Sequence, residues 1–465
     1  MKKRLLSAFM ALALCLTLLP APAWAAEDTQ EPDSGTTEDY VVQVTKTALE
    51  GTGTETKYYN NLPDAFDAAN SSTFTDSDGS ISKVEVKLLK NGATYDLNEL
   101  NFLQLGSYPA YPLRFDYTEG VKVIIDLNGC TLKRTVSEMQ QGILLVEQGD
   151  VTVKNGTLEL DDSGSVNPAQ AIDMPMNGEN PTLTLENMTI TVADIPEDSP
   201  RGDQGYAIDA KGGMLDLQGN TLLDGGLIMS GDAQLKNKLT AGTFTNSGSD
   251  TYSVSVEGST QYGAVFDLLE PGYAFAKYDE NAGNKAGAIV DGSVKQLTED
   301  VIVVAHTHNI VDGSCECGKQ FEAGIPAVDG TITYYETIDE AFANVKANET
   351  VKLMIDSDDR DRQDYIYVVG GPYTFDLNGH RVGHRTDDDN RHQAFLQVGD
   401  PDGNPGTLTV LDSSKTDDTE GTGYFYELKL YNGSLTVESG SFYRYWESAT
   451  TATGTMTFKG GTVDV

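Results

Sequence analysis

The residues best suited to chemistry are two histidines and two cysteines that lie close together in the chain. They form the pattern His306-x-His308-x6-Cys315-x-Cys317. Imidazole nitrogens and thiolates are ligands that Zn²⁺ prefers, and four of them complete a tetrahedral structural site. Because four protein ligands leave no position for water or substrate, the pattern predicts a structural zinc and not a catalytic one.

The spacing of these four residues leaves two other interpretations open. Only one residue separates the members of each pair, which is closer than in zinc fingers and strains a tetrahedron unless the backbone is extended. The same residues also fit a linker that binds no metal. A Cys315–Cys317 disulfide suits an oxidising exterior, but it closes a very small, strained ring.

Elsewhere the sequence contains no set of residues that we predict to be catalytic. Serine-nucleophile, phosphate-loop and dinucleotide-binding motifs do not occur in a suitable context. Acidic residues cluster in runs that are typical of solvated turns, so we expect at most weak surface calcium there. These residues are Asp356, Asp358, Asp359, Asp361, Asp364 and Asp387–Asp389, with Asp400 and Asp402 in an incomplete EF-hand-like pattern.

The first 25 residues have the pattern of a secretory signal. Basic residues at positions 2–4 precede the apolar run Leu5–Leu19, and Ala23-Trp24-Ala25 forms a small-x-small cleavage site. The apolar run is short and an acidic linker follows at 26–40, so no span is expected to remain after signal removal. The sequence therefore predicts a secreted or extracellular protein, with association to a cell wall as one form of it.

The net charge of the chain limits the classes of partner that it can bind. There are 71 acidic and 32 basic residues, a net charge of −39. Three of the basic residues belong to the signal, so the mature chain carries −42. Such a chain repels phosphate backbones, and we expect no nucleic-acid partner.

A long repeat occurs twice in the chain. Tyr58–Phe66 aligns without gaps with Tyr334–Phe342, and in both copies apolar residues recur at i, i+3 and i+4. This spacing predicts a short helix with one buried face, which would cap the open end of a strand stack. A buried-type strand and the phrase Asp-Leu-Asn-Gly follow each copy: Val84–Leu89 with Asp126–Gly129, and Val351–Ile355 with Asp376–Gly379.

A shorter repeat reads apolar-x-apolar, then a corner with Gly or Asn, then Thr or Ser and an apolar residue. Alternation with period 2 indicates strands with one buried face, and Gly or Asn suits a tight corner. Recurrence every 20–30 residues or so is typical of stacked coils. The copies begin at Val151, Leu183, Leu215, Leu239, Leu435 and Met456.

These repeats predict an all-β protein: a right-handed parallel β-helix with short capping helices, in two units. A pair of β-sandwiches is the alternative. The expected organisation is a signal peptide at 1–25, a linker at 26–40, a first unit at 41–304, a His/Cys linker or zinc knuckle at 305–324 and a second unit at 325–465. Since the last repeat stops at Val465 without a cap, the second unit is expected to be truncated there.

The helix and Asp-Leu-Asn-Gly phrases, with Glu270–Phe275 and His306–Gly318, resemble exported Gram-positive, gut-type bacterial proteins of the pectin-lyase-like β-helix family. The resemblance covers most of residues 41–465. It implies a β-helix, but members include polysaccharide lyases, glycoside hydrolases and non-enzymatic adhesins, so it does not determine an activity.

We therefore predict a non-enzymatic module, an adhesin, glycan-binding part or spacer of a larger envelope protein, with a polysaccharide or host glycan as partner. Aromatic rings stack on sugars, and the predicted contacts are Tyr424, Tyr426, Tyr443, Tyr445 and Trp446. Tyr111 lies in a second tyrosine-rich segment. A polysaccharide lyase or glycoside hydrolase is the alternative, which paired carboxylates along a groove would favour.

Overall fold

The computed structural model describes most of the chain beyond the predicted signal and linker. It covers residues 40–49, 53–70, 81–98, 111–114, 120–136, 142–164, 169–176, 180–193, 205–246, 252–282, 285–357, 366–382, 396–414, 423–447, 454–460 and 462–463. At 366, 424–429, 442–447 and 462–463 it describes the backbone alone. The predicted signal peptide and residues 26–39 of the predicted acidic linker lie outside these residues.

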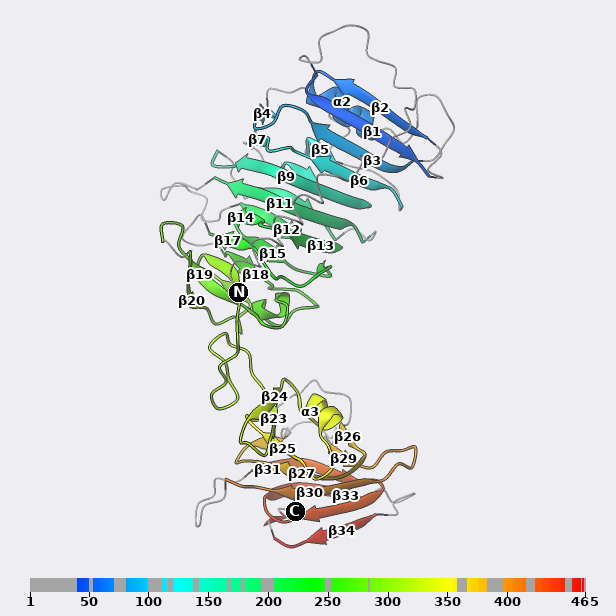
Figure 1. The fold of residues 1–465 in the computed structure, drawn as a ribbon, viewed down its shortest axis with the longest axis vertical. Coiled ribbons are helices and arrows are strands. Elements are labelled where there is room, and N and C mark those ends of the chain that lie inside the picture. The colour runs from blue at the N-terminus through cyan, green and yellow to red at the C-terminus, as the bar shows by residue number, and fades with distance from the viewer. Residues whose placement is uncertain are drawn as a thin grey trace, which may run out of the picture.

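The described residues form an all-β protein in which strands pile up as two stacks along the long axis (Figure 1). The first stack has two sheets. One is ordered β2 (Thr54–Tyr59), β1 (Val42–Ala48), β3 (Ile81–Leu88), β6 (Lys122–Asp126), β9 (Asp150–Asp161), β11 (Thr182–Val192), β14 (Leu222–Asp224), β17 (Thr243–Thr245), β22 (Val301–Ala305), β19 (Tyr273–Tyr278) and β20 (Ala286–Ile289), with β4 (Thr94–Asp96), β7 (Thr131–Thr135), β13 (Met214–Gln218) and β16 (Gln234–Leu235) beside it. The other is ordered β21 (Gln296–Leu297), β18 (Val254–Ser255), β15 (Leu227–Met229), β12 (Tyr206–Ala210), β10 (Gln170–Met174), β8 (Leu144–Leu145) and β5 (Leu113–Arg114).

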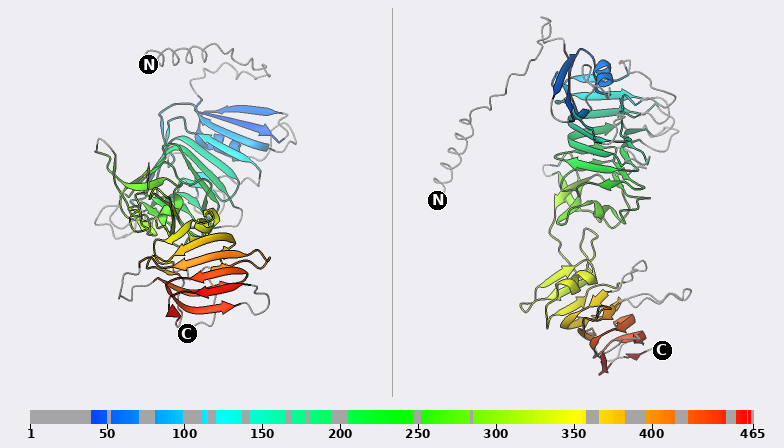
Figure 2. Two further views of the ribbon diagram at one scale, coloured as in Figure 1. Left: turned by 60° about the horizontal axis from the view of Figure 1, so that its bottom comes forward. Right: turned by 90° about the vertical axis from the view of Figure 1, so that its right-hand side faces the viewer.

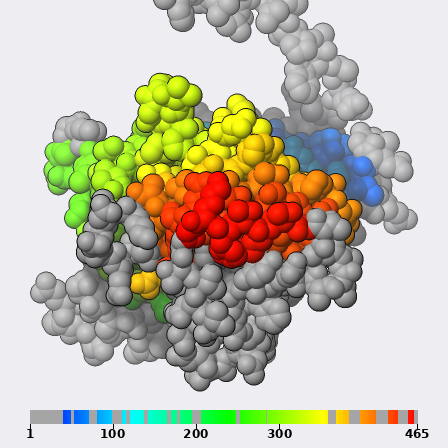
Figure 3. Space-filling model, turned by 90° about the horizontal axis from the view of Figure 1, so that it is seen from below, coloured from blue at the N-terminus to red at the C-terminus, as the bar shows by residue number. Residues whose placement is uncertain are grey.

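The second stack is built in the same way. Its first sheet is ordered β24 (Ile332–Tyr335), β23 (Ala323–Pro326), β25 (Thr350–Leu353), β27 (Gly370–Asp376), β30 (Gly406–Leu411), β32 (Gly433–Val437) and β34 (Thr455–Phe458). Its second contains β26 (Ile366–Val368), β29 (Leu396–Val398), β31 (Tyr424–Leu430), β33 (Ser441–Glu447) and β35 (Thr462–Val463), with β28 (Arg381–Val382) beside β31. The last strands, orange and red, lie at the C-terminal end of this stack (Figures 2 and 3).

Most of the short repeats align as parallel neighbours in register. Val151 and Val153 of β9 pair with Leu183 and Leu185 of β11, and Leu435 of β32 pairs with Met456 of β34. The inward-facing apolar side chains of neighbouring strands therefore line up in columns that run through the stack. One such column is fully buried, with no member more than 1% exposed: Leu113, Leu144, Ile172, Ile208, Leu227 and Val254.

The predicted repeat is wrong by one residue at its third copy. The sequence pattern aligns Leu222 with Ile190, but in the structure Ile190 pairs with Leu223, and Leu222 pairs with Thr189. The corner before Leu222 has one residue more than the corner before Thr189. Because side chains alternate between faces, this shift buries Leu223 completely and turns Leu222 outward.

Asparagines in the left-handed region of backbone conformation form the corners. Asn128, Asn155, Asn187 and Asn378 have φ of 50°, 59°, 53° and 49°. Their short polar side chains tolerate this conformation and bond across the turn. Asn128 Nδ2 donates to the Leu88 carbonyl, and Asn378 Nδ2 donates to the Leu353 carbonyl, each at 3.0 Å. The corner therefore ties one strand to the strand above it.

Two buried aspartates accept hydrogen bonds from backbone N–H groups several positions further along the chain. Asp162 is 0% exposed, and its Oδ2 accepts the Ala169 N–H at 3.0 Å. Asp412 is 5% exposed; its Oδ1 accepts the Gly379 and Ser414 N–H groups, and its Oδ2 accepts the Gly423 N–H. Each carboxylate therefore ties together residues of one stack that are separated along the chain, by 7 positions at Asp162 and 11 at Asp412.

Each stack begins with an antiparallel hairpin and a helix. The helices α2 (Leu62–Asn70) and α3 (Ile338–Asn344) occur where the long repeat predicts them, and Leu62, Ala65, Phe66 and Ile338 are buried. The hairpins β1–β2 and β23–β24, which precede the helices, were not predicted. Their outer strands are polar or half-exposed, so they lack the buried alternation by which the other strands were recognised.

The first stack ends in antiparallel strands and a short 3-10 helix, η1 (Val265–Leu268). β22 runs antiparallel to both β17 and β19. The two stacks have separate apolar cores, one from Val41 to Val303 and one from Ala323 to Val437. In the described part of the chain, no helix has the length and apolar character needed to cross a membrane.

Candidate metal centre at the junction of the stacks

The two histidines and two cysteines come together between the stacks. Their ligand atoms all lie within 4.8 Å of one another. His306 Nε2 is 3.1 Å from Cys315 Sγ, and His308 Nδ1 is 3.4 Å from Cys317 Sγ. Bonds of about 2.3 Å to sulfur and 2.0 Å to nitrogen would place tetrahedral ligand atoms roughly 3.3–3.8 Å apart, so the cluster needs only small adjustments to hold Zn²⁺.

Tight turns in residues 306–321, called the knuckle below, bring the cysteines to the histidines. Cys315 N–H donates to the Lys319 carbonyl, and Gly318 N–H donates to the Cys315 carbonyl, both at 2.9 Å. Gly318 has φ +85°, and a Cβ there would lie 2.0 Å from Asp291 Oδ1. Any other residue at this turn would have a strained backbone and a Cβ that overlaps Asp291, so glycine is required.

The knuckle contacts both stacks. On the first stack, His306 N–H donates to the Gly272 carbonyl at 2.8 Å, and Gly292 N–H donates to the Cys317 carbonyl at 2.9 Å. On the second stack, Lys319 forms an ion pair with Glu336 at 2.5 Å, and Phe321 packs against Tyr334. A small apolar cluster of Ala274, Cys315, Cys317 and Phe321 surrounds the thiols.

The surroundings shift the pKa of two of the four side chains. Burial raises the pKa of the Cys317 thiol to about 11. Burial, followed by the neighbouring His306, lowers the pKa of His308, which favours the neutral imidazole that binds metal. Metal binding at Cys317 must therefore displace a proton from the thiol. Both cysteines are free thiols, so the disulfide interpretation is not borne out.

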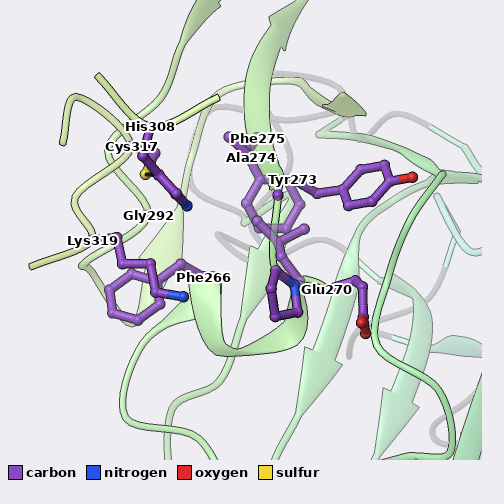
Figure 4. A pocket seen from close by; sticks show the side chains of 12 residues that line it. Phe266, Glu270, Tyr273, Ala274, Phe275, Gly292, His308, Cys317 and Lys319 are labelled. Carbon is purple, nitrogen blue, oxygen red and sulfur yellow. Dashed lines mark hydrogen bonds between the residues drawn. The ribbon is translucent and has the colours of Figure 1, made fainter. Parts of the chain in front are cut away.

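A small cavity adjoins the cluster. His308, Cys317, Gly292, Phe266 and Lys319 are among the residues that line it (Figure 4). Its volume of about 10 Å³ is close to the minimum that one water molecule needs. The cavity is therefore too small for an organic substrate, which agrees with a structural role for the cluster.

The other predicted sites fall mostly outside the described side chains. Tyr424, Tyr426, Tyr443, Tyr445 and Trp446 lie on β31 and β33, but only their backbone is described. Asp358, Asp359, Asp361, Asp364 and Asp387–Asp389 lie outside the described residues. Asp356 Oδ1 accepts the Arg381 N–H at 2.9 Å. Asp400 accepts the Asn404 N–H and side-chain amide, as expected for a turn. Cys130 is fully buried, as predicted, and its thiol donates to the Lys90 carbonyl.

The sequence analysis missed a polar cluster on the second sheet of the first stack. Asp173 of β10 and Asp209 of β12 are direct parallel neighbours. Tyr111 hydroxyl donates to Asp173 Oδ2 at 3.2 Å, and Lys211 Nζ lies 2.6 Å from Asp209 Oδ2. Tyr111 of the second tyrosine-rich segment therefore belongs to this cluster through its hydroxyl. The tripeptide Ala-Ile-Asp occurs at both aspartates and could have revealed the pair.

Asp173 provides a prediction about pH. Burial raises the pKa of its carboxyl, and Asp209 and Glu147 raise it further against the opposing effects of Lys211 and Tyr111. A carboxyl whose pKa is raised by folding loses stabilising effect as the pH rises through the folded pKa. We expect the melting temperature of Asp173→Asn, relative to that of the wild type, to increase as the pH is raised from 4 to 7. Calorimetry measures this difference.

Asp329→Asn is the matched control, and its melting temperature relative to the wild type should change with pH in the opposite direction. Hydrogen bonds from Thr331 lower the pKa of the exposed Asp329 carboxyl. The stabilising effect of this group is present above its unfolded pKa and is lost on acidification. A relative melting temperature of Asp173→Asn that stays constant from pH 4 to pH 7 would contradict the prediction.

Searches against protein-family models, curated proteins and solved structures found no match to this chain. The functional interpretation therefore depends on the site geometry and on the sequence patterns.

Proposed function

We propose that this chain is an exported, non-enzymatic module of a cell-surface protein, in which a zinc ion locks two right-handed parallel β-helices end to end. Its role is that of a spacer or adhesin that holds a binding face away from the cell. The secretory pattern at residues 1–25 and the acidic composition support the exported location. The resemblance to pectin-lyase-like proteins supports the handedness of the coil.

The observation that carries the proposal is the position of the His306/His308/Cys315/Cys317 cluster. Its backbone bonds to Gly272 and Gly292 of the first stack, while its Lys319 and Phe321 contact the second. A metal bound there would cross-link the segment that joins two long bodies. Four protein ligands close the coordination sphere, so the metal would supply rigidity and not catalysis.

Zinc loading of the mature chain, residues 26–465, tests this proposal. We expect elemental analysis to find one zinc per chain. In solution scattering, we expect a single extended particle whose distance distribution broadens after chelation. The proposal would be refuted if the chain contains no zinc after purification from zinc-supplemented medium and its scattering profile does not change when chelator is added.

A carbohydrate-active enzyme is the second candidate, favoured by Asp173 and Asp209. Neighbouring strands lie about 4.8 Å apart, and retaining glycosidases hold their carboxyl groups roughly 5–5.5 Å apart. Against this candidate, Asp173 Oδ1 is buried and accepts no hydrogen bond within the described residues. Incubation with plant and host polysaccharides, with and without calcium, distinguishes the two. Binding without new reducing or unsaturated ends supports the non-enzymatic module, and such products support the enzyme.

A further inference from the structure

A polar groove crosses the outer face of the first sheet near its N-terminal end. It spans β1, β3, β6 and β9, the blue to cyan strands of Figure 1, and encloses about 170 Å³. Its lining side chains include Gln43, Thr45, Glu85, Lys87, Ile124, Asp126 and Lys154. This volume is below the roughly 300–1,000 Å³ of pockets for drug-sized ligands and suits one small ring.

Strand register places these residues in two outward rows. In one row, Gln43 pairs with Lys87, Lys87 with Asp126, and Asp126 with Lys154. In the other, Thr45 pairs with Glu85 and Glu85 with Ile124. Hydrogen-bond donors and acceptors thus alternate along the first row, and the apolar Ile124 lies in the second row beside Glu85.

Several of these groups are held in place before any ligand binds. Asp126 Oδ1 accepts the Asn128 N–H at 3.0 Å and Asn155 Nδ2 at 3.1 Å. Its Oδ2 accepts no hydrogen bond within the described residues. Gln43 Nε2 donates to Thr45 Oγ1 at 3.3 Å, which orients the amide. Groups fixed in this way lose little entropy when they bind a ligand.

The second stack supplies an internal comparison. Its β25 and β27 pair Lys352 with Asp376 in the same register as Lys87 with Asp126. There both carboxylate oxygens of Asp376 are occupied, since Oδ1 accepts the Ser413 N–H and Oδ2 accepts the Ser413 hydroxyl.

The remaining groove positions of the second stack carry other residues. By the same registers, Gly324, Leu411 and Thr374 stand where the first stack has Gln43, Lys154 and Ile124. The second stack therefore forms with other residues at these three positions, while it keeps the equivalent lysine–aspartate pair.

The lining matches the chemistry of a sugar ring. A pyranose has an apolar face of C–H groups and a rim of hydroxyls that both donate and accept. Carboxylate and amide oxygens accept from neighbouring hydroxyls, and lysine ammonium groups donate to them. Opposite charges in the groove, Lys87 and Lys154 with Glu85 and Asp126, leave it without a strong preference for a charged ligand.

We propose that this groove binds one neutral pyranose unit of a glycan, with Ile124 beneath the ring and Asp126, Lys87 and Lys154 bonded to its hydroxyls. The inference rests on the proposed role as a binding module and is independent of the zinc. Loss of zinc leaves the groove intact. A groove that binds no sugar leaves the proposed zinc site intact. The two proposals therefore fail in different experiments.

The test uses the mature chain and immobilised tetrasaccharides of β-1,4-glucan, β-1,4-mannan, α-1,4-glucan and β-1,4-galactan, with oligogalacturonate and a sulfated tetrasaccharide as charged counterparts. We expect saturable binding to a neutral member. Titration calorimetry with that tetrasaccharide should show Lys87→Ala/Lys154→Ala binding at least about ten-fold more weakly, since loss of one charge-assisted hydrogen bond has this effect.

Lys90→Ala/Lys122→Ala is the matched control. Both lysines are exposed near the same strands and do not line the groove, so the charge change is identical. Its affinity should stay within about two-fold of the wild type, and circular dichroism should show all variants folded. Lys154→Leu, which copies the second stack, is a further variant expected to bind weakly. No binding to a panel validated with lectins, binding to charged members alone, or equal loss in both double variants would overturn the proposal.

Discussion

The Cys317→Ser variant is expected to bind no zinc and to open the junction between the stacks. A serine hydroxyl does not ionise at neutral pH, so three ligands remain and the closed tetrahedral site is lost. Because metal binding at such a site contributes folding free energy directly, the loss should appear as local unfolding of the knuckle. The cores of both stacks lie elsewhere and should stay folded.

Hydrogen exchange measured by mass spectrometry resolves this effect by position. A ligand at 100 to 1,000 times its Kd stabilises by about 2.7–4.1 kcal/mol, which corresponds to exchange slowed by roughly two to three orders of magnitude. We expect peptides that contain Cys315, Gly318 and Gly292 to exchange faster by about this factor in Cys317→Ser. Peptides of β11 should not change, and chelator should have no further effect on the variant.

Cys130→Ser is the control for loss of a buried thiol. Cys130 is far from the cluster in sequence, and a serine hydroxyl can replace its hydrogen bond to the Lys90 carbonyl. This variant should retain one zinc per chain and the slow exchange of the knuckle. If Cys317→Ser retains both, the cluster is not the metal site.

Asp412→Asn is expected to destabilise the second stack strongly. The buried carboxylate accepts N–H groups from Gly379, Ser414 and Gly423 and the Ser414 hydroxyl. An asparagine amide would direct N–H groups at some of these donors and leave at least one of them unsatisfied. A lost hydrogen bond to a charged group and an unpaired buried donor together cost about 3–5 kcal/mol.

The loss should be confined to the second stack because the cores are separate. For a body of this size, it corresponds to a decrease on the order of 10 °C in melting temperature. Calorimetry combined with hydrogen exchange of β30 and β11 peptides assigns the transition to a stack. Asp402→Asn, at an exposed position of the same stack, should melt as the wild type does. A second stack that melts at the wild-type temperature in Asp412→Asn would show that the buried carboxylate does not stabilise this stack.

Local patterns predicted the elements whose determinants are local. The helical stripe at Leu62, Ala65 and Phe66 and the alternation at Val151 and Val153 come from neighbouring residues, and both occur in the structure. The clustering of the two histidines and two cysteines was predicted for the same reason, since they lie in one short segment.

What the patterns missed depends on register between distant strands. The groove needs β1 to lie beside β3, and the Asp173–Asp209 pair needs two strands separated by a long excursion to align. A single additional corner residue before Leu222 shifted the predicted alignment, because period-2 alternation carries no information about corner length. Edge strands such as β2 are polar and escape a search for buried alternation.

The buried aspartates have a consequence for engineering. Asp412 anchors both Ser414 and Gly423, so these two positions are held by a contact outside the segment that joins them. Closing a longer loop is inexpensive, since each doubling of its length costs only about 0.6 kcal/mol. A foreign epitope placed between Ser414 and Gly423 would therefore be displayed at a fixed height on a rigid support.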